Sequence, residues 1–146
     1  MSTPWQHDNP ARRRVRLIDA KLARGADMKT QAEIALEWEA VEYRGRAQAI
    51  GQGAIDLRVC VEATLDALHE LLGGRMNFRL IGVKSVRAFD DAVSIVALSV
   101  HDPDTGESRR LMGTALASDG DIPQGVARAV LNATNRVLGN FLATHE

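Results

Sequence analysis

The sequence has little of what several common functions require. Only one of its 146 residues is a cysteine, Cys60, so an internal disulfide and a four-thiolate zinc site are both excluded. No apolar run approaches the roughly 20 residues that span a bilayer. The formal net charge of -1 gives no general attraction to nucleic acid or to anionic lipid. We therefore expect a protein of the reducing cytoplasm, with neither nucleic acid nor membrane as a partner.

The rest of the composition is ordinary for a globular domain. Hydrophobic residues make up 45% of the chain and charged residues 25%. A chain of this length buries roughly two-thirds of its unfolded surface. Residues 1–11 are polar and show no periodicity, so we expect a flexible tail there. Residues 12–146 are expected to form a single domain, with one unit over about 12–74 and a second over about 75–146.

The first unit is predicted to be a hairpin, a glycine turn and a helix. Residues 12–25 begin with arginines, and their pattern leaves helix and strand open. Residues 34–43 alternate between apolar and polar, as half-buried strands do. Arg44-Gly45 is then expected to form a turn before a short strand over residues 46–50. Apolar residues at helical spacing follow until Gly73-Gly74 ends the helix.

The second unit repeats this order. Strands are predicted over residues 78–89, 92–100 and 108–117, and the middle one is apolar on both faces, which places it inside its sheet. A long amphipathic helix follows the polar turn at residues 118–121. The pattern as a whole predicts an α+β fold of two β-strand-and-helix units.

Residues 51–56 place Gly51, Gly53 and Asp56 between a strand and a helix. Glycines there let backbone amides approach a ligand, and the free N–H groups of a first helical turn attract anions. A tight turn with Asp56 as the N-terminal cap explains the motif without any ligand. The third glycine of the dinucleotide-binding fingerprint is absent.

A similar arrangement begins the second helix, where Gly113 precedes Asp121, Ile122 and Pro123. Asp121 is suited to cap the helix, and Pro123 fits its first turn. Two helix starts that each carry an acidic side chain beside free amides suit a zwitterionic amino acid. The amides would hold its carboxylate and an aspartate its ammonium, whereas capping explains either motif alone.

Residues suited to catalysis are few. The histidines His7, His69, His101 and His145 share no metal-ligand or catalytic-triad spacing, and we expect them at the surface. Cys60 has apolar neighbours, which favours a buried, inert thiol. We therefore expect no catalytic residue, no metal site and no cofactor.

Taken in order, these segments resemble the C-terminal regulatory domain of 2-isopropylmalate synthase and citramalate synthase. The resemblance covers about residues 34–142, and residues 51–56 resemble the family's G-x-G-P-V-D. The other matching segments are Phe78-Arg79-Leu80, Asp91-Ala92, Gly113, Asp121-Ile122, Ala129 and residues 131–136.

The resemblance implies a domain that pairs with a second copy and binds leucine or isoleucine near the dimer interface. It implies effector-binding roles for Gly51, Gly53, Asp56, Gly113, Asp121 and Ile122. The chain departs from the family where Ala54 replaces a proline, where Leu57 replaces a small residue, and where residues 118–120 lengthen the second turn. The 146 residues cannot hold the family's catalytic barrel, so synthase activity would need a separate catalytic subunit.

Two other interpretations stay open beside an amino-acid-sensing homodimer. The departures at Ala54 and Leu57 favour a dimerisation adaptor that binds no ligand. Residues 54–144 follow the order helix, three strands, helix, which is typical of double-stranded-RNA-binding modules. Such modules need basic residues at the start of the second helix, where this chain has Asp119 and Asp121.

Overall fold

The computed structural model describes residues 14–144. The tail expected over residues 1–11 lies outside the described residues, as do His7 and His145. Each unit has three antiparallel strands followed by a helix, which confirms the predicted α+β fold. The elements are β1 (Arg16–Arg24), the 3₁₀ turn η2 (Ala26–Met28), β2 (Lys29–Trp38), β3 (Val41–Ile50), α2 (Ala54–Leu72), β4 (Asn77–Ala88), β5 (Asp91–His101), β6 (Ser108–Leu116), the 3₁₀ turn η3 (Ser118–Gly120) and α3 (Ile122–Thr144).

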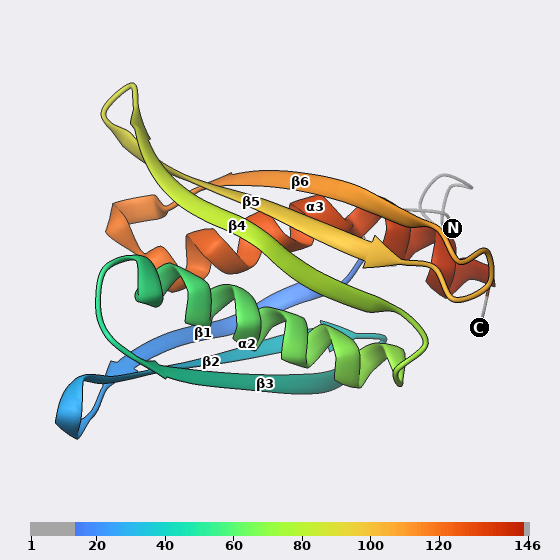
Figure 1. The fold of residues 1–146 in the computed structure, drawn as a ribbon, viewed down its shortest axis with the longest axis horizontal. Helices are drawn as coiled ribbons and strands as arrows, with labels where there is room; N and C mark the ends of the chain where they lie inside the picture. Colours follow the sequence, from blue (N-terminus) through green and yellow to red (C-terminus); the bar gives the residue numbers. More distant parts are fainter. Residues whose placement is uncertain (1–13, 145–146) are drawn as a thin grey trace, which may run out of the picture.

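The two helices form a central layer between the two sheets (Figure 1). The sheets have the orders β1-β2-β3 and β4-β5-β6. Helix α2 packs on β2 and β3 of its own unit and contacts β4, whereas α3 packs on β5 and β6 and contacts β1. The buried side chains of both units therefore form one hydrophobic core.

The first sheet corrects the predicted turn. Residues 12–25, left open by their pattern, provide β1, so the hairpin expected here is a three-stranded sheet. The chain reverses at Glu39 and Ala40, with φ of 50° and 66°, and not at Arg44-Gly45. Positive φ at both central residues is the conformation of a two-residue hairpin turn. No glycine or asparagine marks this turn, and the glycine that suggested one lies within β3.

The second sheet and both helices agree with the sequence analysis. The three predicted strands match β4, β5 and β6 closely, and β5 is central in its sheet. Helix α2 ends at Leu72 and is capped by Gly73. The left-handed φ of 61° at Gly73 lets its N–H donate a hydrogen bond to the Glu70 carbonyl in the last turn. The predicted apolar residues of both helices face the core, and among them Leu65, Leu72 and Val130 are buried.

The third strand of each unit approaches its helix through a glycine. A Cβ atom on Gly45 would lie 2.0 Å from the carbonyl oxygen of Ala63, and one on Gly113 would lie 2.1 Å from that of Ala129. Both would also lie 2.4 Å from a second helix backbone atom, the nitrogen of Ala67 or Ala133. The two units therefore repeat the same strand-to-helix contact, which defines equivalent positions along α2 and α3.

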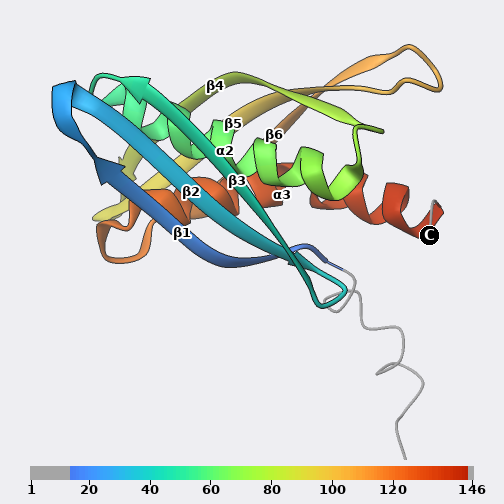
Figure 2. The ribbon, with the colours of Figure 1, turned by 90° about the horizontal axis from the view of Figure 1, so that it is seen from below.

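The two helices run in the same direction and begin at the same end of the molecule (Figures 1 and 2). The turn η2 and the tip of the β4–β5 hairpin lie at this end as well. The fold thus brings the two predicted helix starts together, and we call this region the helix-start end.

Candidate functional site

The start of α2 carries two glycines that differ in their surroundings. Gly51 has φ of 134°, its N–H donates to the Met28 carbonyl at 3.0 Å, and a Cβ there would lie 2.9 Å from Ile55 Cγ1. Gly53 is the N-terminal cap, with φ of 67° and open space where a side chain would be. No side chain caps this helix start. Its first-turn amides are therefore shielded by little besides backbone.

Asp56 is engaged by a residue that the sequence analysis did not select. Arg24, at the end of β1, donates through Nη1 to Oδ1 at 3.1 Å and through Nη2 to Oδ2 at 2.5 Å. This bidentate pair raises the pKa of Arg24 through the hydrogen bond and the charge of Asp56. The interpretation of Asp56 as the cap is wrong, because Gly53 holds that position and Asp56 faces β1.

The start of α3 behaves as predicted. The Oδ1 atom of Asp121 accepts a hydrogen bond from the Gln124 N–H at 3.1 Å, which is the geometry of an N-terminal cap. Asp121 is exposed, and Ile122 is the first residue of α3 and packs partly buried against the core. Asp121 therefore keeps one carboxylate oxygen open to solvent while it caps the helix.

The pKa of Cys60 in α2 responds to burial and to the aspartates at both helix starts. Burial raises the pKa of its thiol to about 12, and the charges of Asp56 and Asp121 add to that rise. The buried thiol expected from the sequence is confirmed, and its raised pKa leaves little thiolate at neutral pH.

Apolar side chains are exposed on the segments that lead into the helices. Met28 is 54% exposed, Ile50 at the end of β3 is 75% exposed, and Leu116 at the end of β6 is 58% exposed. Ile55 and Ile122 add partly buried branched side chains next to both helix starts. The helix-start end thus combines two helix N-termini, charged groups and apolar surface.

Gly113 does not belong to this region. It is buried in β6 against the middle of α3, so its role is the close packing described above. Arg24, in contrast, was missed because the pattern of residues 12–25 left their structure undecided. The alternation of β1 places Leu22 and Arg24 on the same inner face, which is the signal that would have found it.

Comparison with models of known protein families finds no match. A search of curated proteins finds no similar one either.

His69, expected at the surface, is only partly exposed. Its ring stacks on Phe78 with centroids 6.3 Å apart, and its Nε2 accepts the Phe78 N–H at 3.1 Å. Burial lowers the pKa of His69 from its ordinary value of 6.5. Within residues 14–144, no three His, Cys, Asp or Glu side chains are grouped so that they could hold a metal ion. No helix in this part of the chain is long and apolar enough to cross a membrane.

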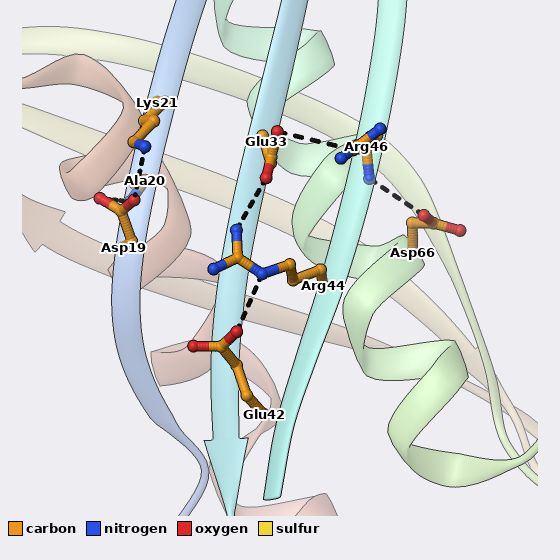
Figure 3. Close-up of polar contacts among 8 residues, drawn as sticks. All are labelled: Asp19, Ala20, Lys21, Glu33, Glu42, Arg44, Arg46 and Asp66. Atoms are coloured by element: carbon orange, nitrogen blue, oxygen red, sulfur yellow. Dashed lines mark hydrogen bonds and ion pairs between the residues drawn. The ribbon is translucent and has the colours of Figure 1, made fainter.

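The outward faces of the two sheets differ in chemistry. On the first sheet, Arg44 bonds Glu33 and Glu42 at 2.8 Å each, and Arg46 lies 3.5 Å from Glu33 (Figure 3). Lys21 pairs with Asp19 on the same face, again as Figure 3 shows. These charged side chains therefore form ion pairs with one another on the outward face of the first sheet.

The outward face of the second sheet combines exposed apolar side chains with basic ones. Lys84 lies opposite Ile95 and Arg110 lies opposite Ser99, and neither basic residue forms an ion pair with a described residue. Met112 and Leu116 project from β6, and Val86, 40% exposed, projects from β4. The partly buried Val93 and Ile95 of β5 lie between them. Exposed apolar side chains that cluster on a sheet in this way are typical of an interaction surface.

Proposed function

We propose that this chain is a non-catalytic homodimeric domain that binds a branched-chain amino acid at the helix-start end, leucine before isoleucine. The resemblance to the 2-isopropylmalate synthase regulatory domain suggests this function. The observation that carries it is that the two helices start at one end of the fold (Figure 1), where charged and apolar side chains flank both starts. A separate catalytic synthase subunit would be the protein that such a sensor regulates.

Each part of a leucine zwitterion has a partner in this arrangement. The uncapped first turn of α2 and the exposed side of the Arg24 guanidinium suit its carboxylate. The open oxygen of Asp121 suits its ammonium, whereas Asp56 is committed to Arg24. Met28 and Ile122 offer apolar contact to a branched side chain.

The dimer is proposed to form through the outward face of the second sheet. Two copies that pair face to face through β4, β5 and β6 would bury the apolar side chains described above. Such a contact uses the same patch on both subunits, as symmetric dimers do. The first sheet offers less apolar surface, because paired charges occupy the middle of its outward face and exposed Ile50 lies at its end.

Calorimetric titration of leucine tests the proposal. Asp121→Ala removes both the cap and the charge, whereas Asp121→Ser keeps a capping oxygen and removes only the charge. If Asp121 holds the ammonium, both variants weaken leucine binding by about tenfold to a hundredfold, because a charge-assisted bond contributes about 1.5–3 kcal/mol. Asp104→Ala, a matched change in the β5–β6 turn, leaves the affinity unaltered.

The Arg24–Asp56 pair favours a second candidate function, a dimerisation adaptor without a ligand. The pair occupies the carboxylate that would otherwise attract an ammonium group beside α2. If leucine, isoleucine and valine all give no heat while the protein sediments as a dimer, the adaptor replaces the sensor. A monomer in sedimentation contradicts both.

A further inference from the structure

A groove runs along α3 between the edge strands of the two sheets, β6 and β1. One hollow of about 710 Å³ is lined by Arg14, Arg109, Arg110 and Arg136 together with asparagines of α3. A second hollow of about 410 Å³ continues it past Arg16 and Arg128, and the two share Asn132 and Asn135. We call this surface the α3 groove.

The α3 groove concentrates positive charge in a chain whose formal net charge is -1. Among residues 14–144, no acidic residue lines either hollow. Of its arginines, Arg16 pairs with Glu37 at 3.5 Å, and the other five form no ion pair with any residue in the range 14–144. Neighbouring unpaired guanidinium groups repel one another, so an anion that neutralises them binds favourably.

The internal repeat shows that this charge is not a requirement of the fold. The glycine contacts align Ala63 with Ala129, which makes Glu62 the equivalent of Arg128 and Glu70 the equivalent of Arg136. A shared hydrogen bond supports the alignment. Asp66 accepts the Arg46 N–H at 3.0 Å, and its equivalent Asn132 accepts the Thr114 N–H at 3.1 Å. The same helix face is therefore acidic on α2 and basic on α3.

Acidic residues bound the α3 groove at both ends. Asp119 and Asp121 precede α3, and Asp102 and Asp104 line the hollow that adjoins the groove near the end of the helix. Between them, Arg128 and Arg136 lie about 12 Å apart along the helix axis. A long polyanion would meet carboxylates at either end, so the groove suits a short anion.

One uncharged group in the groove also lacks a partner. The Oδ1 atom of Asn135 is buried and accepts no hydrogen bond from any described residue. A buried acceptor without a donor is unfavourable. A phosphate group carries no donor for it, whereas the hydroxyl of a phosphate ester does.

We propose that the α3 groove binds a short organic oligophosphate of nucleoside-triphosphate size, with its phosphates on the arginines and a hydroxyl on Asn135, whose side chain turns so that its buried Oδ1 atom meets the ligand. Arginine forks match phosphate oxygens two at a time, which explains the use of arginine in place of lysine. The two hollows have the volume of small-molecule sites. This site is distinct from the helix-start end proposed for the amino acid.

Titration of the full chain with ATP and with inorganic triphosphate tests the proposal. We expect ATP to bind at one site per chain and more weakly as salt is raised. Arg136→Glu lowers the affinity by about tenfold or more, since it replaces a charge-assisted contact with repulsion. The variant should fold, because Glu70 occupies the equivalent position of α2. Arg58→Glu, the same change on an exposed position of α2 outside the groove, is the matched control.

A second variant tests the hydroxyl contact. Asn135→Leu should weaken ATP binding and leave inorganic triphosphate binding unchanged. Absence of ATP binding at low salt, or equal losses in Arg136→Glu and Arg58→Glu, would refute the site. Tight binding of double-stranded RNA without ATP binding would replace it with a polymer-binding surface. If Asn135→Leu weakened the binding of ATP and of inorganic triphosphate equally, the proposed contact between Asn135 and a hydroxyl of the phosphate ester would be refuted.

Discussion

The first sheet presents paired charges to solvent, whereas the second presents exposed apolar side chains beside basic ones that form no ion pair with a described residue. Every ion pair between described residues lies in the first unit, including those of Arg44 and Arg46. In the second unit, Met112 is 63% exposed and Leu116 58%. The two units nevertheless share strand order, antiparallel pairing and the glycine contact to the helix. The comparison separates positions that the fold requires from positions free to acquire a function.

The largest expected effect is a loss of stability when the glycine at the strand-to-helix contact shared by both units is replaced. Gly113→Ala and Gly45→Ala each place a Cβ about 2 Å from a helix backbone oxygen, and backbone atoms cannot rotate out of the way. The strand must therefore move away from the helix. We expect each change to lower the free energy of unfolding by about 3 kcal/mol or more. Urea unfolding measures this directly.

Two glycines without such contacts provide controls for these variants. At Gly82 in β4 and Gly139 in α3, an added Cβ would meet no atom of another element within 4 Å. Gly139→Ala should raise the free energy of unfolding by about 0.5–1 kcal/mol, because alanine is favoured over glycine inside a helix. Equal stabilities of Gly113→Ala and Gly139→Ala would show that the close approach in the second unit is relaxed in solution.

The next largest effect is a change of oligomeric state, which tests the difference between the outward faces of the two sheets. Met112→Glu puts a charge in the middle of the proposed dimer contact, where a second copy would have to desolvate it. Sedimentation should then change from twice the chain mass of 15.9 kDa to that mass. Arg44→Gln, on the outward face of the first sheet, should leave the dimer intact. Dissociation by Arg44→Gln alone would place the interface on the first sheet.

The alternation and helical spacing of apolar residues were enough to predict both units. They located β4, β5, β6 and both helices, because these elements have one buried face each. They misplaced the first reversal because Glu39 and Ala40 form a turn without glycine, while Gly45 is needed for packing. A glycine in a strand marks either a turn or a close approach, and sequence alone does not separate the two.

The candidate sites were less predictable than the fold. Asp121 was placed correctly because capping is a local interaction between neighbouring residues. The partner of Asp56 is Arg24 on β1, far away in sequence. The local rule for helix capping therefore assigned Asp56 the wrong role. The α3 groove joins the start of β1, β6 and α3, so its arginines come from three segments that lie far apart in the chain. Such sites become visible only once the sheets are assembled.

The smallest expected effect is a pH dependence of stability that arises from α2 and not from α3. His69 on α2 corresponds to Asn135 on α3, so only the first unit carries a titrating group at this position. Burial lowers the pKa of His69 from 6.5, although Asp66 and Glu62 act in the opposite direction. The unfolded chain therefore binds a proton at a higher pH than the folded protein does. The stability that neutral His69 provides is complete above about pH 6.5 and is lost as the pH falls through the folded pKa.

Urea unfolding at about pH 7.5 and about pH 5.5 measures this loss. Protonation at Nε2 also breaks the hydrogen bond from the Phe78 N–H, so wild-type protein should be less stable at the lower pH. His69→Gln removes the titration and should show a smaller difference between the two pH values. His101→Gln, a matched change at an exposed position at the end of β5, should keep the wild-type difference. An unchanged difference in His69→Gln, or a reduced one in His101→Gln, would assign the pH dependence to other groups.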